Sequence, residues 1–181
     1  MSTDQREAER RARFEELARE LIDPLRRFLA RRTDAATADD VLADTLLVCW
    51  RRFDELPEDP LPWAYGVARN CLANLDRGAR RQQRLAARIA TLDPPPSSTA
   101  GPEATDGPVA EALAALRPDD AELLRLWAWE RLTPAEMAVV LGITANAASI
   151  RLHRAREKLR AVLGKMSAPS GHEESREGRT S

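Results

Sequence analysis

The sequence predicts an all-α fold made of two small helical domains joined by a flexible linker. Alanine, leucine and arginine dominate the composition, and these residues favour helices. Apolar residues recur at three- and four-residue spacing along most of the chain, and the strict alternation typical of strands is not found in the sequence. A stretch rich in proline, serine and glycine, residues 93–108, separates a first domain at residues 5–92 from a second at residues 109–165.

The first domain begins with two predicted helices. One covers about residues 5–32, where apolar side chains keep the spacing of a single buried face and Pro24 is a candidate kink. The other is expected to start at Thr37, a good N-cap residue with Asp40 at the N3 position, and to run through Phe53.

Residues 54–62 contain three prolines and four acids, so they cannot continue the second helix. A third helix is predicted from Trp63 onward, with its apolar residues again in register. We expect Gly78 to weaken this helix before the basic segment at residues 80–89.

Four further helices are predicted in the second domain, at about residues 109–116, 119–130, 134–141 and 145–163. Residues 166–181 are mostly polar and carry no apolar stripe, so a disordered tail is expected there.

Several classes of protein are disfavoured. Cys49 and Cys71 stand alone, and His153 and His172 are widely separated, so the sequence predicts neither a metal site nor a cofactor site. No nucleotide-binding or hydrolase motif is present, which argues against an enzyme. The sequence contains neither a secretion signal nor a membrane-spanning apolar run, so a cytoplasmic protein is expected.

The net charge of −1 conceals two basic segments. Residues 61–90 hold six arginines against one aspartate, and residues 146–166 hold six basic side chains against one glutamate. The remaining segments are acidic on balance. This pattern suggests two separate contacts with a polyanion, although two solvated helix faces would give the same charges.

A helix-turn-helix is the strongest local signal. Thr133 is a good N-cap residue, Pro134 suits the first helical position, and Glu136 completes a capping box. Gly142 then allows a tight turn, and Ile143 provides an apolar plug behind it. The pattern predicts two helices that meet at a steep angle, as in many DNA-binding domains.

The last predicted helix has an apolar stripe and an opposite polar face. Asparagine, serine and arginine can hydrogen-bond base edges, while the flanking cations suit phosphates. Ile150 is a candidate contact to a thymine methyl group, or simply an exposed apolar residue. The candidate DNA-binding residues on this helix are Asn146, Ser149, Ile150, Arg151, His153, Arg154 and Lys158.

The first domain also has aromatic and amide groups beside its basic segment. Trp63, Tyr65 and Asn74 adjoin the arginines that start at Arg77, an arrangement suited to unstacked single-stranded bases. Core packing is the stronger expectation for Trp63. Trp50, at the end of an acidic helix, suits either core packing or a protein-docking surface.

Three stretches together resemble the extracytoplasmic-function (ECF) sigma factors of the sigma-70 family. Residues 38–50, ADDVLADTLLVCW, resemble the region-two helix that docks on RNA polymerase. Residues 63–81, beginning WAYGVARN, resemble the segment that opens and reads the minus-ten promoter element. Residues 132–144 with 150–156 resemble region four, which reads the minus-thirty-five element.

The resemblance implies a non-catalytic subunit that is monomeric when free. Its implied partners are the clamp and flap of core RNA polymerase, promoter DNA and, as in many relatives, an anti-sigma factor. The implied polymerase-docking residues are Asp40, Asp44, Leu47, Trp50 and Arg51. The implied minus-ten residues are Trp63, Asn70, Asn74, Arg77, Arg80 and Arg81. The seven residues of the last helix would read the minus-thirty-five element.

Two other classes remain as alternatives. A stand-alone helix-turn-helix repressor or response regulator would be expected to form a dimer or to carry a sensor domain. A helical scaffold or anti-sigma protein would use the basic segments only as solvated faces. Charge reversal at Arg151 and Arg154 would then leave promoter binding unchanged.

Overall fold

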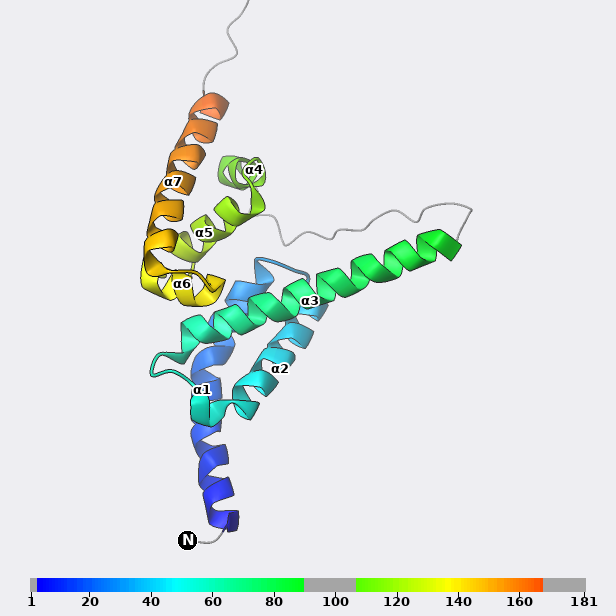
Figure 1. Cartoon of the computed structure of the whole chain (residues 1–181), viewed down its shortest axis with the longest axis vertical. Coiled ribbons are helices and arrows are strands. Elements are labelled where there is room, and N and C mark those ends of the chain that lie inside the picture. Colours follow the sequence, from blue (N-terminus) through cyan, green and yellow to red (C-terminus); the bar gives the residue numbers. More distant parts are fainter. Residues whose placement is uncertain (1–2, 90–106, 168–181) are drawn as a thin grey trace, which may run out of the picture.

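The computed structural model describes residues 3–89 and 107–167, and these residues form helices and short connections (Figure 1). The α-helices are α1 (Thr3–Ala30), α2 (Ala35–Arg51), α3 (Pro60–Ile89), α4 (Pro108–Ala114), α5 (Pro118–Ala128), α6 (Pro134–Leu141) and α7 (Ala145–Ser167). A short 3₁₀ turn, Phe53–Glu55, follows α2. The predicted all-α fold with two helical domains is confirmed.

The first domain is formed by α1, α2 and α3, which pack against one another. Its centre is built from apolar side chains with no more than a few per cent of their surface exposed, including Leu25, Phe28, Val41 and Cys49. Tyr65 of α3 lies beside Phe28, with ring centroids 4.8 Å apart. Helix α1 continues through Pro24 in a single span. Burial of these side chains is the main driving force for the packing.

The start of α2 corrects one prediction. Asp34, and not Thr37, is the N-cap: its carboxylate accepts hydrogen bonds from the backbone N–H and the hydroxyl of Thr37, at 3.0 and 2.7 Å. These bonds hold the pKa of Asp34 below its ordinary value. A carboxylate satisfies the free N–H groups of the first turn and favours the positive end of the helix dipole, so it is a suitable cap here.

Helix α3 is longer than predicted. It begins at Pro60, because proline can occupy the first turn where its missing N–H has no helical partner. It continues past Gly78 to Ile89, so the glycine that we expected to weaken the helix does not end it. Residues 56–59 alone separate it from the 3₁₀ turn.

The second domain contains α4 to α7, whose core includes Leu123, Leu126, Met137 and Ala148. Gly107 and Pro108, predicted as the last linker residues, form the N-cap and first residue of α4. Helix α7 runs to Ser167, and so includes the first residues of the predicted tail. The rest of the predicted linker and tail, residues 93–106 and 168–181, lies outside the described residues.

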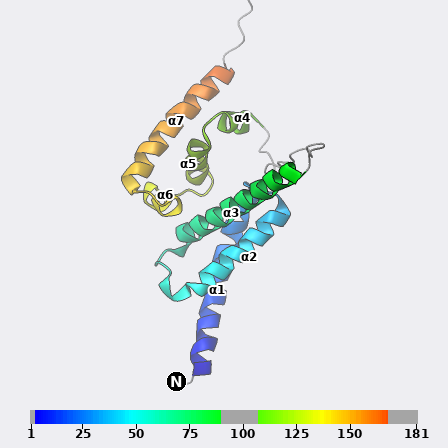
Figure 2. The ribbon, with the colours of Figure 1, turned by 45° about the vertical axis from the view of Figure 1, so that its right-hand side comes forward.

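The two domains pack against each other, which the sequence did not predict. Helix α6 lies across the N-terminal half of α3, as the views in Figures 1 and 2 both show. Gly66 of α3 is buried at this crossing, where a Cβ atom would lie 3.4 Å from the carbonyl oxygen of Val140. Because Gly66 has no side chain, the two helix backbones can approach closely.

Among the described residues, no single helix has the length and hydrophobicity to cross a membrane. The pair α6 and α7 passes that composition test only when taken together, and the two helices are bent by 103° at the turn between them. Residues 3–89 and 107–167 also contain no group of three or more His, Cys, Asp or Glu side chains placed to hold a metal ion.

Candidate functional site

The two helices α6 and α7 and the turn between them have the geometry that their sequence predicts. The Thr133 hydroxyl accepts from the Glu136 backbone N–H at 3.3 Å, and Glu136 accepts from the Thr133 N–H at 2.6 Å, which completes the capping box. Gly142 ends α6 in the left-handed conformation, with φ of 63°. The steep angle of 103° between the helices confirms the predicted helix-turn-helix.

Helix α7 presents all seven predicted DNA-binding residues at the surface. Its opposite face is buried through Ala148, Leu152 and Ala155, which pack against the rest of the second domain. Ile150 is 44% exposed among polar neighbours. A solvent-facing helix of this kind can enter a major groove, where side chains at its N-terminal end reach base edges.

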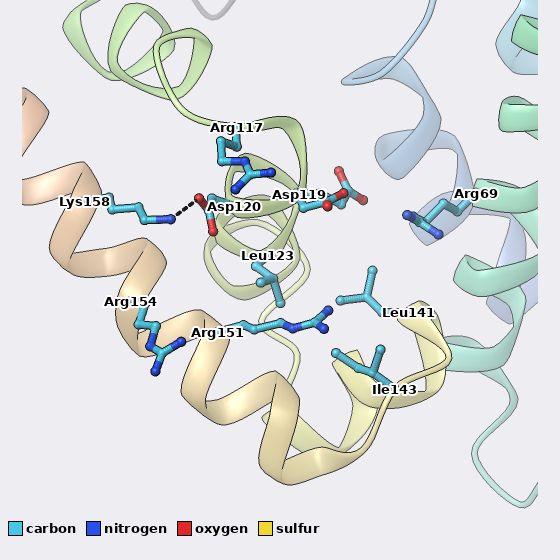
Figure 3. A pocket seen from close by; sticks show the side chains of 11 residues that line it. Arg69, Arg117, Asp119, Asp120, Leu123, Leu141, Ile143, Arg151, Arg154 and Lys158 are labelled. Atoms are coloured by element: carbon cyan, nitrogen blue, oxygen red, sulfur yellow. Dashed lines mark hydrogen bonds and ion pairs between the residues drawn. The ribbon is translucent and has the colours of Figure 1, made fainter.

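One flank of α7 faces a charged cleft of about 320 Å³ (Figure 3). Arg151, Arg154 and Lys158 line it from α7, and Arg69 lines it from α3 in the first domain. Lys158 is held here by an ion pair with Asp120 of α5, with 2.6 Å between Nζ and Oδ2. Three of the predicted DNA contacts therefore lie on the side of α7 that faces the first domain.

The other flank of α7 faces Trp127 of α5, a functional candidate that the sequence analysis missed. Ser149 and His153 line a groove of about 790 Å³ together with Trp127. The guanidinium of Arg156 lies 4.6 Å from the Trp127 ring centroid, and Trp127 is 41% exposed. Trp127 and Arg156 are far apart in sequence, so helical periodicity could not pair them.

Glu157 was also missed, although its position could have been read from the helical period. It lies one turn after His153 on the exposed face, and its carboxylate is 3.4 Å from the imidazole Nε2. An acidic group on this face repels phosphate and can accept a hydrogen bond from a cytosine amino group.

Five of the six predicted minus-ten residues share one face of α3. At about 100° per residue, Trp63, Asn70, Asn74, Arg77 and Arg81 point in similar directions, while Arg80 is turned well away from them. Trp63 is half-buried and the others are exposed. The Arg77 guanidinium donates a hydrogen bond to the Asn74 side-chain oxygen, and Tyr65 is buried in the core.

Four of the five predicted polymerase-docking residues form an exposed stripe along α2. Asp40, Asp44, Leu47 and Arg51 are spaced by four, three and four residues, and Leu47 is 44% exposed. We call these four residues the α2 stripe.

Trp50 does not belong to the α2 stripe. Its ring packs edge-on against Phe14 of α1, with centroids 5.1 Å apart. The guanidinium of Arg10 lies 4.1 Å from the centroid of the Trp50 ring. Of the two roles left open for Trp50, the structure shows packing within the domain.

Comparisons with known proteins identify the family to which the two helical domains and the helix-turn-helix belong. Residues 107–159 match the family model described as "Sigma-70, region 4". The chain is 31% identical over 160 residues to the RNA polymerase sigma factor CarQ of Myxococcus xanthus, covering 84% of this chain and 90% of CarQ. It is 28% identical over 138 residues to the ECF RNA polymerase sigma factor SigL of Mycobacterium tuberculosis, covering 72% and 76%. The structure of the sigma factor RpoE, in complex with the anti-sigma factor NepR from Bartonella quintana, matches with a TM-score of 0.62 at 20% identity, covering 83% of this chain and 96% of that one.

An all-α, two-domain fold with an exposed helix-turn-helix is typical of DNA-binding proteins of transcription. The chain belongs to the extracytoplasmic-function sigma factors of the RNA polymerase sigma-70 family. As a sigma factor it acts with core RNA polymerase and directs promoter-specific transcription.

Proposed function

We propose that the two domains divide promoter recognition between them. The first domain, residues 5–92, binds core polymerase through the α2 stripe and holds the melted minus-ten strand along α3. The second domain, residues 109–165, reads the minus-thirty-five element with α7. The chain is non-catalytic and monomeric when free, and it acts in the cytoplasm, where the polymerase transcribes the genome.

The exposed face of α7 carries this proposal. It combines base-reading groups at its N-terminal end with cations on its flanks, behind a turn of helix-turn-helix geometry. The face of α3 adds the second element, since half-buried Trp63, two amides and two arginines suit unstacked bases and their phosphates. A covalent tether makes the second contact effectively intramolecular, so neither domain has to bind tightly alone.

The proposal also gives the α2 stripe a role, as the surface that binds core polymerase. Two carboxylates, one arginine and a half-exposed leucine form a mixed surface of the kind found at protein interfaces. RpoE, a structural neighbour, is held by the anti-sigma factor NepR in its crystal structure. We propose that this chain also has an anti-sigma partner.

The test is reconstituted transcription. The purified chain is mixed with bacterial core polymerase and genomic DNA, and the 5′ ends of the transcripts are mapped. New starts that share two spaced upstream elements, and that are absent without the chain, support the proposal. With a closely related core enzyme, no new starts would favour the repressor alternative, for which a dimer on duplex DNA would be the next observation.

Matched variants then separate the two elements. Arg154→Ala weakens use of promoters through the upstream element, whereas Lys165→Ala removes the same charge from the far end of α7 and leaves the starts unchanged. Asn74→Ala weakens opening at the minus-ten element without changing duplex binding upstream. Equal behaviour of Arg154→Ala and Lys165→Ala would contradict the assigned role of α7.

A further inference from the structure

One residue of the second domain has an unusual backbone conformation for its type. Arg131, between α5 and α6, has a φ of 56°, and among the described residues it is the single non-glycine with a positive φ. The left-handed region is unfavourable for a residue with a Cβ atom, whereas glycine reaches it without that cost. An arginine in this conformation therefore suggests a use for its side chain.

The turn at Arg131 is fixed by the contacts that follow it. The Leu132 N–H donates to the Leu126 carbonyl oxygen at 3.2 Å, and the Leu132 side chain is buried. Thr133, the next residue, caps α6. These contacts account for the left-handed backbone at position 131, but they do not account for an arginine there, because glycine forms such turns more easily.

The Arg131 side chain lines the same groove as Trp127 and Arg156. Arg131 is exposed, and Arg156 is half-buried with its guanidinium 4.6 Å from the Trp127 ring centroid. A guanidinium held against an aromatic ring keeps N–H donors free at its edge, and it has lost part of its rotamer freedom before any ligand binds. The groove therefore presents a prepositioned cation beside a second cation on a constrained turn.

The groove also lacks acidic side chains. No aspartate or glutamate is among the described residues that line it. Within the part of the chain that the structure describes, neither Arg131 nor Arg156 forms an ion pair. The cleft on the opposite flank of α7 differs, since three carboxylates line it and Lys158 is paired there with Asp120. Positive charge that no carboxylate neutralises is thus available in the groove.

The groove adjoins residues that we assign to reading bases. Ser149 and His153 of α7 line it together with the two arginines. When a recognition helix lies in the major groove, the phosphates that border that groove come nearest to the flanks of the helix. The groove is therefore placed to meet the backbone of one strand while α7 faces the bases.

We propose that Arg131 and Arg156 bind backbone phosphates of one promoter strand beside the minus-thirty-five element, and that Trp127 positions Arg156 for this contact. The inference rests on the proposed function of α7. Phosphate contacts fix the register and orientation of a protein on the duplex without reading its sequence. This site holds α7 at the depth from which Asn146 and Ser149 reach base edges.

The first experiment measures holoenzyme binding to a duplex promoter identified by transcript mapping. Arg131→Gly removes the cation and should weaken binding. One phosphate contact contributes about 0.9 to the slope of log affinity against log salt, so the loss should be about 3.5 times larger at 50 mM than at 200 mM salt. The melting temperature should stay equal or rise by up to about 4 °C, because glycine relieves the backbone at this position.

Two further variants make this comparison specific for charge. Arg131→Lys keeps the cation and should keep most of the affinity and of the salt slope. Lys165→Ala removes a charge from the far end of α7 and should leave both unchanged. Unaltered affinity and slope in Arg131→Gly would overturn the inference, and so would a loss in Arg131→Lys as large as that in Arg131→Gly.

The second experiment tests the positioning role of Trp127. Trp127→Ala and Arg156→Ala should each weaken binding, and the double variant should bind no more weakly than Arg156→Ala alone, because Trp127 acts through the arginine. Trp127→Phe keeps an aromatic face and should restore most of the affinity. Circular dichroism checks that helix content is retained. Additive losses in the double variant would overturn the positioning role.

A third set of measurements identifies what occupies the groove. If Arg131→Gly weakens binding to core polymerase and not to the promoter, the groove faces the polymerase and the inference is overturned. If reconstituted transcription gives no new starts, the proposed function fails. Binding of the full chain to random-sequence duplex DNA then decides the inference separately: weaker binding by Arg131→Gly than by Lys165→Ala supports the phosphate site, and equal binding overturns it.

Discussion

Lys158 of the recognition helix donates to Asp120 of α5, with 2.6 Å between Nζ and Oδ2, although the sequence suggests a phosphate contact for this lysine. The Asp120 side chain is 15% exposed and that of Lys158 is 48% exposed. We expect Lys158→Ala to loosen the packing of α5 on α7 by up to about 1 kcal/mol, the usual range of a partly exposed pair. Hydrogen exchange of α5 and α7 in the full chain measures this.

The same variant should change binding to duplex promoter DNA by less than about twofold. Lys165→Ala, at the end of α7, is its control for charge loss. A loss of affinity as large as that of Arg154→Ala would show instead that Lys158 leaves Asp120 for a phosphate in the complex.

Substitutions of base-reading and of phosphate-binding residues in α7 should change the salt dependence of DNA binding differently. Arg154→Ala is expected to weaken holoenzyme binding uniformly across sequences and to lower the slope of log affinity against log salt by about 0.9. Asn146→Ala and Ile150→Ala should relax preference at particular base pairs, by about 1–3 kcal/mol each, and leave the slope unchanged. Binding titrations over a promoter library at several salt concentrations distinguish the two patterns. Equal slopes for all three variants would contradict the assignment.

The capping box at the start of α6 should contribute measurably to the second domain. Thr133→Ala removes the hydroxyl that accepts from Glu136 and is expected to cost about 1 kcal/mol of stability. Thr133→Ser keeps the hydroxyl and should recover most of that loss. Thermal unfolding of both variants, with hydrogen exchange to localise the change to α6, provides the measurement. Equal destabilisation by alanine and serine would point to lost methyl packing and not to the cap.

The buried tyrosine predicts a loss of stability at alkaline pH. Burial, and next the nearby Glu130 carboxylate, raise the pKa of Tyr65 to about 12, from an ordinary value of 10. The folded state therefore holds the phenolic proton more tightly than the unfolded state. The contribution of this bound proton to the free energy of unfolding is complete below pH 10 and is lost as the pH rises from 10 to 12.

Tyr65 is the single tyrosine of the chain, so tyrosinate absorbance follows its ionisation directly. Tyr65→Phe should lose less stability than the unmodified chain over this pH range, by at most about 1.4 kcal/mol per pH unit. Urea titrations across the range measure the difference. Ionisation of Tyr65 near pH 10 in the folded chain would contradict the prediction.

The α2 stripe should be the part of the first domain most sensitive to charge change in polymerase binding. Asp44→Arg and Leu47→Asp are each expected to cost more than about 1 kcal/mol of affinity for core polymerase, the threshold for an important interface residue. Asp23→Arg, on the exposed face of α1, is the control. Fluorescence titration of labelled chain with core enzyme measures the three affinities. If all three variants bind equally, the docking surface lies elsewhere.

Helix caps and turns were predictable from the sequence where they depend on residues that are neighbours in the chain. Thr133, Glu136 and Gly142 specify a cap and a turn within ten residues, and the structure contains both. The same reasoning chose the wrong cap for α2, because Asp34 and Thr37 are both competent and the stronger acceptor prevails. Gly78 did not interrupt α3, since a single glycine costs only about 1 kcal/mol in a long helix.

The sequence by itself determined the helical fold, the helix-turn-helix and the faces on which Asn146, Asp44 and Asn74 lie, because helical periodicity and capping act over a few residues. Only the tertiary structure decided that Arg32 meets Glu130, that Gly66 meets Val140 and that Arg156 stacks on Trp127. Arg32 and Glu130 are 98 residues apart. Such contacts depend on the shape of two assembled surfaces, and no period in the sequence encodes that shape.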